Sequence, residues 1–333
     1  MKAVVVYEKG KYEIHDVPTP RLNDGDVLIK ISYAALCYRD LLQLAGYYPR
    51  MKYPVILGHE AVGIVVESRD PRFKPGDRVV PLLHEPDGVC EFCVRGLDSY
   101  CINAHSYGED VDGFFAEYAR VSGNALVKVP NGVPDELAAF TPCVVAMVYK
   151  GLRRAGLVSG ETVVVTGASG GVGIHAVQLA KALGARAIAV TRSPEKARFI
   201  RQFADDVITE PKFSKAVKDL TNGVGADVVI EAVGTPTLEE SLRSLRSGGR
   251  IIIIGNVNPD ETYPLRLGYL IMKDIVMIGN VRSNRSDVAE TFRILSRGLV
   301  KPIIASTYPL DRFSDALEFM RNNSRIGKIL IKP

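Results

Sequence analysis

The sequence lacks a long run of lysine and arginine, and no ladder of aromatic residues interleaves its basic ones. The formal net charge of the 333 residues is only +4, so charge and pattern together exclude nucleic acid as a main partner. No apolar stretch is long enough to cross a bilayer, and the start MKAVVVYEKG has a strand-like pattern in which no signal peptide fits. We therefore expect no membrane partner, and the cysteine pattern considered next argues for a reducing cytoplasm.

Cysteine is also scarce, and the five that are present do not suit a disulfide scaffold. Their number is odd, and Cys90, Cys93 and Cys101 are clustered, with Asp87 just before them. A two-residue gap lets a tight loop wrap one ion, and a longer gap lets the chain return to close a tetrahedron. These four residues therefore predict a structural zinc site. Because a carboxylate is a harder ligand than a thiolate, the alternative is an incomplete loop with free thiols.

The two remaining cysteines, Cys37 and Cys143, could belong to a second and more open site. His59 and Glu60 add an imidazole and a carboxylate to the two thiols, and this set of groups can bind zinc. The residues are far apart in the sequence, so spacing alone favours packed core residues over metal ligands.

The hydrophobic pattern divides the chain into two parts. With 47% hydrophobic residues, the length favours two domains. Short strands broken by turns are predicted at 4–7, 27–31 and 61–67. From residue 162 strands and helices alternate, which predicts a parallel, doubly wound sheet; the expected elements are strands 162–166, 187–191, 226–231 and 250–254 and a helix 174–183. A helix 287–297 and a strand 328–332 follow, so we expect one domain of residues 1–143 and 284–333, and another of residues 144–283.

A glycine-rich turn lies between the first predicted strand and helix of the second domain. Such a turn lets backbone amides approach a pyrophosphate at the helix N-terminus. The strand, turn, helix and strand context predicts a dinucleotide site rather than a plain loop. The residues of this turn are Gly167, Ser169, Gly170, Gly171, Val172 and Gly173.

The end of the second strand should select the cofactor. An NAD site usually places Asp or Glu there, whereas this chain has Thr191, Arg192, Ser193 and Lys196. Guanidinium and ammonium groups attract a 2′-phosphate, and the hydroxyls can hydrogen-bond it. We therefore predict NADPH; the alternative is that Arg192 is a solvated surface charge, and Glu195 lies nearby.

The whole chain resembles the zinc-containing medium-chain dehydrogenase/reductase superfamily. The residues that carry the resemblance are Gly58-His59-Glu60, Cys37-Tyr38-Arg39-Asp40, Cys143 before Tyr149-Lys150, and the Asp87 cluster. The resemblance implies an α/β protein with a GroES-like β-rich catalytic domain and a Rossmann domain. It also implies a catalytic-type zinc on Cys37, His59 and Cys143, with Glu60 as an exchangeable ligand and Asp40 orienting His59. A dimer or tetramer is implied in the same way.

Two positions depart from the alcohol dehydrogenases of this superfamily. Arg39 replaces the Ser or Thr that passes the alcohol proton outward, and Leu42 replaces the relay histidine. The glycine turn and Gly46-Tyr47-Tyr48-Pro49 look more like the quinone and enoyl reductase branch. Four segments, residues 36–43, 46–54, 112–117 and 255–257, are similar to the archaeal acryloyl-CoA reductases, which implies NADPH-dependent reduction of acryloyl-CoA to propionyl-CoA.

This resemblance suggests roles that the residues alone leave open. Tyr48 is a candidate proton donor or a plain rim tyrosine, and Arg39 could hold an anionic group or form a simple salt bridge. Arg50 and Lys52 could meet the phosphates of a CoA thioester. The zinc at Cys37 could act in the reaction or only in the structure. The competing functions are a zinc-dependent NADP(H) alcohol or aldehyde dehydrogenase, a quinone-type reductase, and a non-catalytic NADPH-binding protein.

Overall fold

The computed structural model describes residues 1–322 and 325–333, which form two compact units. The first consists of Met1–Ala146, Arg282–Gly298 and Ile304–Pro333, and the second of Met147–Val281 and Leu299–Ile303. The expected boundaries place 299–303 in the first domain, whereas the structure packs this segment with the second unit. The reason is a set of hydrogen bonds to α5 (Gly171–Ala182): the side chain of Gln178 accepts from the Lys301 amide at 2.8 Å, and His175 Nε2 lies 3.1 Å from the Ile303 amide.

The first unit is built mainly of antiparallel sheets. A seven-stranded sheet has the order β10-β6-β5-β3-β18-β17, with β9 also paired to β3; β17 and β18 run parallel, and the other described pairs in it are antiparallel. A three-stranded sheet (β2-β1-β4) and a two-stranded one (β7-β8) complete the strands. Their bounds are β1 Lys2–Glu8, β2 Lys11–Asp16, β3 Asp26–Leu36, β4 Val55–Ile56, β5 Ala61–Ser68, β6 Arg78–Pro81, β7 His84–Glu85, β8 His105–Ser106, β9 Tyr118–Ser122, β10 Leu126–Lys128, β17 Ile304–Pro309 and β18 Lys328–Lys332.

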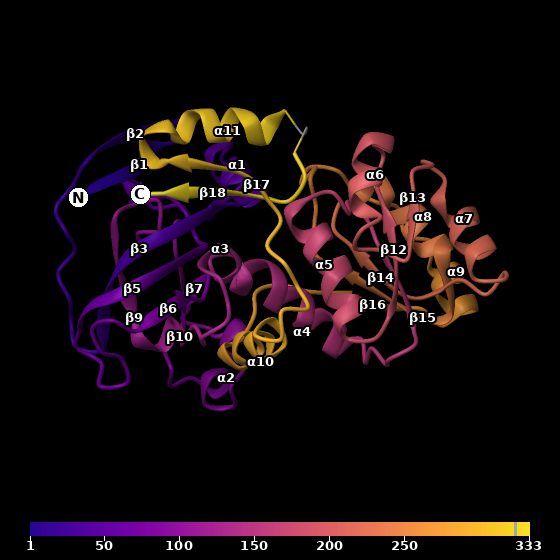
Figure 1. The fold of residues 1–333 in the computed structure, drawn as a ribbon, viewed down its shortest axis with the longest axis horizontal. Helices are drawn as coiled ribbons and strands as arrows, with labels where there is room; N and C mark the ends of the chain where they lie inside the picture. The colour runs from indigo at the N-terminus through magenta and orange to yellow at the C-terminus, as the bar shows by residue number, and fades with distance from the viewer. Residues whose placement is uncertain (323–324) are drawn as a thin grey trace. The chain divides into compact units, whose positions relative to one another are not determined.

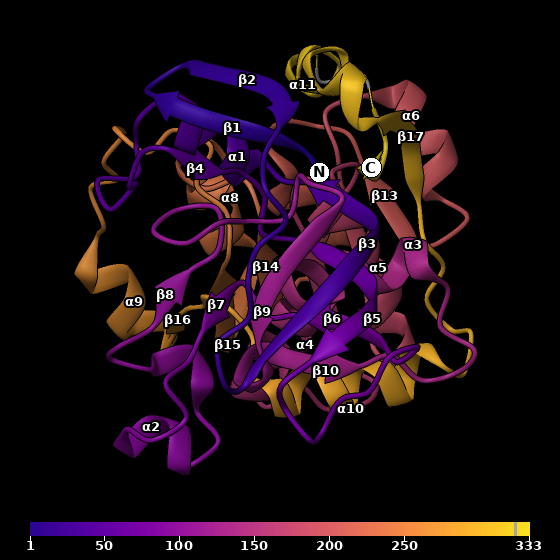
Figure 2. The same ribbon diagram turned by 90° about the vertical axis from the view of Figure 1, so that its left-hand side faces the viewer.

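Short helices join and cover these strands. Figure 1 shows α11 lying over β17 and β18, with which it is in contact. Figure 2 shows α2 at the opposite end of this unit from β1, β2 and α11. The helical segments are α1 Tyr38–Leu44, α2 Glu91–Val94, η1 Asp98–Tyr100, η2 Gly123–Ala125, α3 Asp135–Ala138, the π-helical turn η3 Thr141–Val145, α10 Arg285–Leu295, η4 Leu310–Arg312 and α11 Phe313–Arg321.

The second unit holds a six-stranded sheet in the order β13-β12-β11-β14-β15-β16, in which every pair is parallel. This confirms the predicted doubly wound sheet. Helix α5 packs on β11 and β12, and α8 packs on β14 and β15 (Figure 1). The elements are α4 Ala146–Arg154, β11 Thr162–Val165, α5, β12 Arg186–Val190, α6 Pro194–Ile200, β13 Asp206–Ile208, α7 Phe213–Leu220, β14 Ala226–Glu231, α8 Thr235–Ser244, β15 Leu245–Ile253, α9 Leu267–Lys273 and β16 Val276–Gly279.

The core of this sheet explains why its strands read as continuous apolar runs. Val164, Ile188, Val229 and Ile251 come from four strands and are all fully buried in one cluster. Strands of a parallel sheet are covered on both faces, so few of their positions can be polar. The order of strands reverses between β11 and β14, and ligands of such sheets bind where this reversal occurs.

The predicted elements are present with small shifts at their ends. The helix predicted at 174–183 begins earlier, at Gly171, because Gly170 occupies its N-cap with an extended backbone. Strand β15 begins at Leu245 rather than at 250, and α10 covers Arg285–Leu295 rather than 287–297. Among the described residues, no helix has both the length and the apolar character needed to cross a membrane.

Candidate metal and cofactor sites

The structure brings Cys37, His59, Glu60 and Cys143 together within the first unit. Cys37 stands at the N-cap of α1 directly after β3, and His59 and Glu60 lie between β4 and β5. Cys143 is supplied by the turn η3. One candidate ligand atom from each residue lies within 4.8 Å of all the others, and the set is largely buried. Residues that are distant in the sequence therefore form one compact set of four donor groups.

Three glycines allow the backbone to pack tightly behind this set. Gly58 has a φ of +101°, and a Cβ atom there would lie 2.9 Å from the backbone nitrogen of Phe115. A Cβ on Gly113 would overlap the carbonyl oxygen of Gly58, and one on Gly108 would approach that oxygen to 2.7 Å. The glycine that precedes His59 is therefore required by sterics as well as by its left-handed backbone.

Two further charged residues hold the donor groups in place. Asp40 Oδ1 lies 3.1 Å from His59 Nδ1, and Asp40 Oδ2 accepts a hydrogen bond from the Cys37 amide at 2.8 Å. Lys328 Nζ, on β18, lies 2.6 Å from Glu60 Oε2 and donates to the carbonyl of Leu36 at 2.7 Å. Asp40 is thus placed to orient the imidazole, and Lys328 to hold the carboxylate.

Charges within the cluster shift its pKa values. A hydrogen bond with Cys143 holds the pKa of Cys37 well below the ordinary value for a thiol. Burial opposes protonation of His59, yet the neighbouring Asp40 carboxylate raises the pKa of His59 to about 9. Burial raises the pKa of Glu60 to about 7, although Lys328 opposes that shift. A divalent cation competes with these protons, because such ligands bind metal in their deprotonated form.

The donor set fits a zinc ion. Within residues 1–322 and 325–333, His59 Nε2 and Glu60 Oε1 are buried and make no hydrogen bond, and they lie 3.9 Å apart. A buried polar atom without a partner is costly, so such atoms usually serve a ligand or an ion. Thiolate, imidazole and carboxylate groups are the ligands that zinc prefers. The arrangement can therefore hold one zinc ion through Cys37, His59 and Cys143, with Glu60 as a fourth group.

The lobe formed by Asp87, Cys90, Cys93 and Cys101 is a second compact cluster. Its ligand atoms also lie within 4.8 Å of one another. Asp87 Oδ1 accepts from the amides of Val89 and Cys90 at 2.9 and 3.0 Å. These backbone hydrogen bonds hold the pKa of Asp87 far below its ordinary value, so its carboxylate is anionic.

This second cluster also fits a zinc ion. All five cysteines of the chain are free thiols, so none of the cluster's three is used in a disulfide. Burial raises the pKa of Cys93, whereas a backbone hydrogen bond with Cys93 lowers that of Cys90. Three sulfurs and one anionic oxygen surround a common centre, as a closed structural site requires.

Arg39 and Tyr48 are brought together beside the first cluster. The guanidinium carbon of Arg39 lies 5.1 Å from the centre of the Tyr48 ring, and Arg39 Nη2 lies 2.8 Å from Glu109 Oε2. The simple salt bridge considered from the sequence is therefore present. Burial raises the pKa of Tyr48, and the charge of Arg39 opposes that shift, so the phenol is protonated near neutral pH.

The glycine turn of the second unit has the geometry of an anion-binding loop. Gly167 has a φ of +59°, and Gly170 caps α5. A Cβ on Gly173 would overlap the carbonyl oxygen of Gly167, so the turn can close only with glycine there. The first amides of α5, from Gly171 and Val172, have no partners within the helix and can face a phosphate.

The residues predicted to select the cofactor follow β12. Thr191 is buried, whereas Arg192 is exposed. The Ser193 hydroxyl accepts from the Lys196 amide at 3.2 Å and so caps α6. The carboxylate that an NAD site would place at this strand end is absent, since Thr191 and Arg192 occupy it.

Three residues with structural roles were missed from the sequence. The sequence predicts Lys328 only as a residue of a strand. A lysine at the start of the apolar run Ile-Leu-Ile was the available signal that its charge is buried. Glu109 lies far from Arg39 along the chain, and no local sequence pattern indicates that the two residues form an ion pair. Glu231, fully buried at the end of β14, accepts from Thr166 Oγ1, Thr237 Oγ1 and Ser241 Oγ and fixes the turn after β14.

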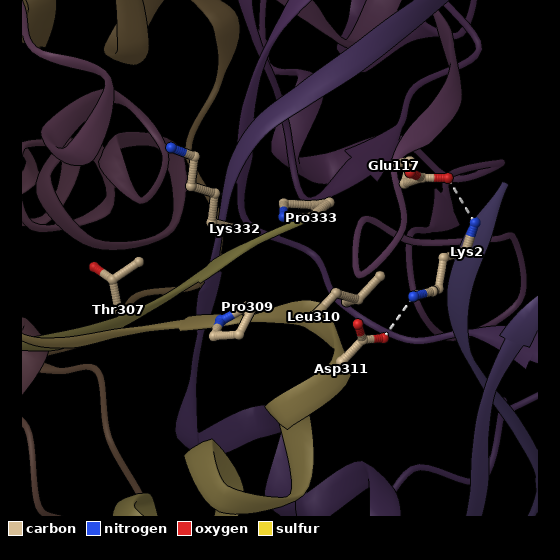
Figure 3. Close-up of a pocket in the computed structure, with 8 residues that line it drawn as sticks. All are labelled: Lys2, Glu117, Thr307, Pro309, Leu310, Asp311, Lys332 and Pro333. Carbon is tan, nitrogen blue, oxygen red and sulfur yellow. Dashed lines mark hydrogen bonds and ion pairs between the residues drawn. The ribbon is translucent and has the colours of Figure 1, made fainter.

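A surface hollow of about 460 Å³ is a separate feature (Figure 3). Figure 3 shows Lys2 between two carboxylates: its ammonium lies 2.8 Å from Asp311 and its amide donates to Glu117 at 2.7 Å. The charges around the hollow are therefore already compensated in part. No predicted site residue belongs to the lining, which consists of Lys2, Glu117, Thr307, Pro309, Leu310, Asp311, Lys332 and Pro333.

Comparison with known proteins gives consistent matches over both units. Residues 23–131 match the model of the alcohol dehydrogenase GroES-like domain, and residues 171–297 match that of the zinc-binding dehydrogenases. The chain is 50% identical to the acryloyl-coenzyme A reductase of Sulfurisphaera tokodaii over 100% of both chains. It is 51% identical to the acryloyl-coenzyme A reductase of Metallosphaera sedula over 99% of both.

Solved structures give the same picture of the fold. The crystal structure of AibC superposes with a TM-score of 0.93 at 34% identity, covering 100% of this chain and 96% of that one. A zinc-binding dehydrogenase of Sinorhizobium meliloti bound to NADP superposes with a TM-score of 0.89 at 26% identity, covering 100% and 99%. The predicted combination of a GroES-like domain and a Rossmann domain is confirmed.

Proposed function

The chain belongs to the zinc-binding medium-chain dehydrogenase/reductase family, and on that premise we propose that it reduces the C=C bond of an α,β-unsaturated acyl-CoA with NADPH. The substrate that we propose is acryloyl-CoA, and the product is propionyl-CoA. The observation that carries the proposal is the full-length similarity, at 50% and 51% identity, to two relatives named acryloyl-coenzyme A reductase. The absence of the alcohol relay at Arg39 and Leu42 supports a reductase over an alcohol dehydrogenase.

The reaction transfers a hydride to the β-carbon and a proton to the α-carbon. Negative charge then develops on the thioester oxygen, and a catalyst must stabilise it. A zinc ion held by Cys37, His59 and Cys143 would supply a Lewis acid for that oxygen. Asp40 keeps His59 in one orientation, and Lys328 holds the Glu60 carboxylate through its Oε2 atom.

Tyr48 is the proton donor in this proposal. Its phenol is half-buried and protonated near neutral pH, and Arg39 fixes the ring from one face. A positioned general acid contributes about 10²–10⁴-fold to a rate. The proton would pass from the phenol, or from a water that it orders, to the α-carbon of the substrate.

Tyr48→Phe should lower kcat with acryloyl-CoA by about 10²-fold, with little change in KM, because the ring stays and only the hydroxyl is lost. Steady-state kinetics at saturating NADPH provide the measurement. Tyr47→Phe, at the exposed neighbouring tyrosine, is the matched control and should leave kcat unchanged. Unaltered turnover in Tyr48→Phe removes this residue from the mechanism.

NADPH is the cofactor that we propose for the glycine turn. The support is the pair of cationic side chains, Arg192 and Lys196, at the end of β12, where an NAD site would carry a carboxylate. The hydroxyls of Thr191 and Ser193 lie at the same strand end. The zinc-binding dehydrogenase of Sinorhizobium meliloti, of the same fold, was solved with NADP.

Arg192→Ala should weaken NADPH binding by about tenfold or more and leave NADH binding unchanged, because only NADPH carries the 2′-phosphate. Fluorescence titration of both cofactors gives the two dissociation constants. Arg198→Ala removes an exposed arginine of α6, the helix that follows Arg192, and serves as the control. Equal NADPH affinity in wild type and Arg192→Ala contradicts the assignment.

Self-association is a further part of the proposal. Strand β16 forms an edge of the six-stranded sheet, and Val276 on it is half exposed. Open strand edges readily pair with another chain. We propose a dimer or tetramer joined through this unit, and light scattering that returns a monomer mass at micromolar concentration contradicts it.

Location in the cytoplasm is proposed from the free thiols and is checked by cell fractionation.

One assay separates the candidate functions. Purified protein with NADPH should consume the cofactor when acryloyl-CoA is added, and turnover of primary alcohols with NADP should be slow. Crotonyl-CoA in the same panel shows how the acyl group affects the rate. Rapid alcohol oxidation that stops with a chelator would instead identify an alcohol dehydrogenase, and cofactor binding without any turnover would indicate a non-catalytic protein.

A further inference from the structure

Three arginines from distant parts of the first unit converge on the segment His105–Asp110. Arg39 Nη2 lies 2.8 Å from Glu109 Oε2, and Arg50 Nη2 lies 3.4 Å from Asp110 Oδ2. Arg282 Nη2 donates to Ser106 Oγ at 2.8 Å. We call Arg39, Arg50 and Arg282 the arginine cluster.

The three guanidinium groups are close enough to influence one another. Burial lowers the pKa of Arg282, and the charges of Arg39 and Arg50 lower it further, while Glu109 and Asp110 oppose the shift. Three cations and two carboxylates thus share a partly desolvated region. Electrostatic attraction for an added anion is stronger there than on an open surface, because the effective dielectric constant is lower.

The cluster extends from the interior of the unit to its surface. The side chain of Arg39 is 14% exposed and that of Arg50 is 57% exposed. At the inner end Arg39 contacts the Tyr48 ring, and Arg39 itself lies two residues after Cys37 at the start of α1. A charged path therefore runs from solvent toward the residues that we assign to the reaction.

The segment that supports the cluster is held firmly by hydrogen bonds. Asp110 Oδ1 accepts from the Ser106 amide at 2.5 Å, which closes a tight turn within the segment. The Lys52 amide donates to the Glu109 carbonyl at 2.8 Å. This second bond joins the segment to the loop that carries Tyr48, so the carboxylates and the loop are fixed relative to each other.

Two further features restrict movement around the cluster. Gln43 Nε2, on α1, donates to the carbonyl of Gly108 at 2.7 Å. Arg282 has a φ of +49°, a left-handed backbone conformation that is unfavourable for a residue with a side chain. The surrounding structure must therefore hold Arg282 in place. The cluster is thus preorganised, and little ordering is needed when a ligand binds.

We propose that Arg50 and Arg282 bind a phosphate group of the acyl-CoA substrate. The proposal rests on the function proposed above, and it names the part of the substrate that the chain recognises. A planar guanidinium group matches the geometry of phosphate and can bind it with two parallel hydrogen bonds. The sequence suggested Arg50 and Lys52 for the CoA phosphates. It did not indicate Arg282, which the folded structure brings to the same segment as Arg50.

The test compares two thioesters that differ in the phosphates and the adenosine of CoA. Propionyl-CoA carries them, and S-propionyl-pantetheine does not; neither has a free thiol that could bind zinc or a double bond that NADPH could reduce. Calorimetric titration of the full zinc-loaded chain with NADPH present gives both dissociation constants. Wild type should bind propionyl-CoA more tightly, and Arg282→Gln and Arg50→Gln should each weaken that binding by about tenfold or more, with pantetheine thioester binding unchanged.

Matched controls keep the result specific. Arg21→Gln removes an exposed arginine elsewhere in the first unit and should change neither constant. Because Arg50 is exposed, Arg50→Gln should fold even if Arg282→Gln does not. Equal loss for both thioesters, or a loss of NADPH affinity instead, overturns the proposal.

The outcomes also distinguish this inference from the proposed function. If wild type reduces acryloyl-CoA but both variants bind propionyl-CoA as wild type does, only the phosphate site is wrong. If wild type neither reduces acryloyl-CoA nor binds propionyl-CoA, the proposed function is wrong, and the phosphate site that depends on it is wrong as well. Inorganic phosphate should compete with propionyl-CoA and not with the pantetheine thioester, and competition with both contradicts the assignment.

Discussion

Lys328→Met should destabilise the protein by about 3–5 kcal/mol at pH 8, because it leaves the buried carboxylate of Glu60 without its counter-charge. Lys328 Nζ lies 2.6 Å from Glu60 Oε2, and their side chains are 5% and 0% exposed. Methionine fills a similar volume, so the loss of charge dominates over the loss of packing. Denaturant unfolding of metal-depleted wild type and variant measures the difference.

The expected loss depends on pH in a defined direction. Burial already raises the pKa of Glu60 to about 7, and removal of the lysine raises it further. A carboxyl whose pKa is higher in the folded than in the unfolded state favours folding as pH falls through the folded value. The variant should therefore recover stability as the pH is lowered from 8 toward 5, where Glu60 becomes protonated.

Two controls separate charge from packing. Lys332→Met removes an exposed lysine of the same strand and should change stability by less than about 0.5 kcal/mol. Adding Glu60→Gln to Lys328→Met removes the uncompensated charge and should restore part of the loss. A double variant no more stable than Lys328→Met alone contradicts the electrostatic explanation.

Cys93→Ser should remove one zinc ion per chain and loosen the lobe, because Cys93 is the most buried donor of the Asp87 cluster. Binding of a structural zinc contributes directly to folding, so the loss of stability should be on the order of several kcal/mol. Elemental analysis should give about two zinc ions per wild-type chain and about one in the variant.

The reciprocal variant shows which site each metal occupies. Cys37→Ser should also remove one zinc ion, but protease cleavage should increase in the lobe only for Cys93→Ser. Wild type with a single zinc ion that Cys93→Ser removes would mean that the Cys37 cluster holds none. Two zinc ions retained in Cys93→Ser would contradict the assignment of the lobe.

The sequence predicts those parts of the fold whose signals are local. The parallel sheet is confirmed because apolar strands, a glycine turn and helical stretches follow one another from residue 162 onward. Strand β18 agrees at both ends with the predicted strand at residues 328–332. The sequence did not predict that helix α5 begins at Gly171, because a glycine inside a motif does not show by itself whether it belongs to the turn or to the helix.

The clusters differ in how far they could be inferred. Asp87, Cys90 and Cys93 are neighbours in the sequence, so their spacing indicates a common centre. Cys143 could be linked to Cys37 only through resemblance to a family, because packing of distant segments decides their distance. The partners Lys328 and Glu109 lie far from Glu60 and Arg39 along the chain, and only the folded structure reveals them.

The close packing of Gly58 against Gly108 and Gly113 has a consequence for protein engineering. Gly108 immediately precedes Glu109, and Gly58 immediately precedes His59, so the two backbones cannot be displaced independently. A designer who lengthens or reshapes the segment around Gly108, which supports the proposed phosphate site, will also disturb the support of the His59 imidazole. Affinity for the CoA phosphates and metal retention should therefore change together, and libraries that vary both segments at once have the better prospect of success.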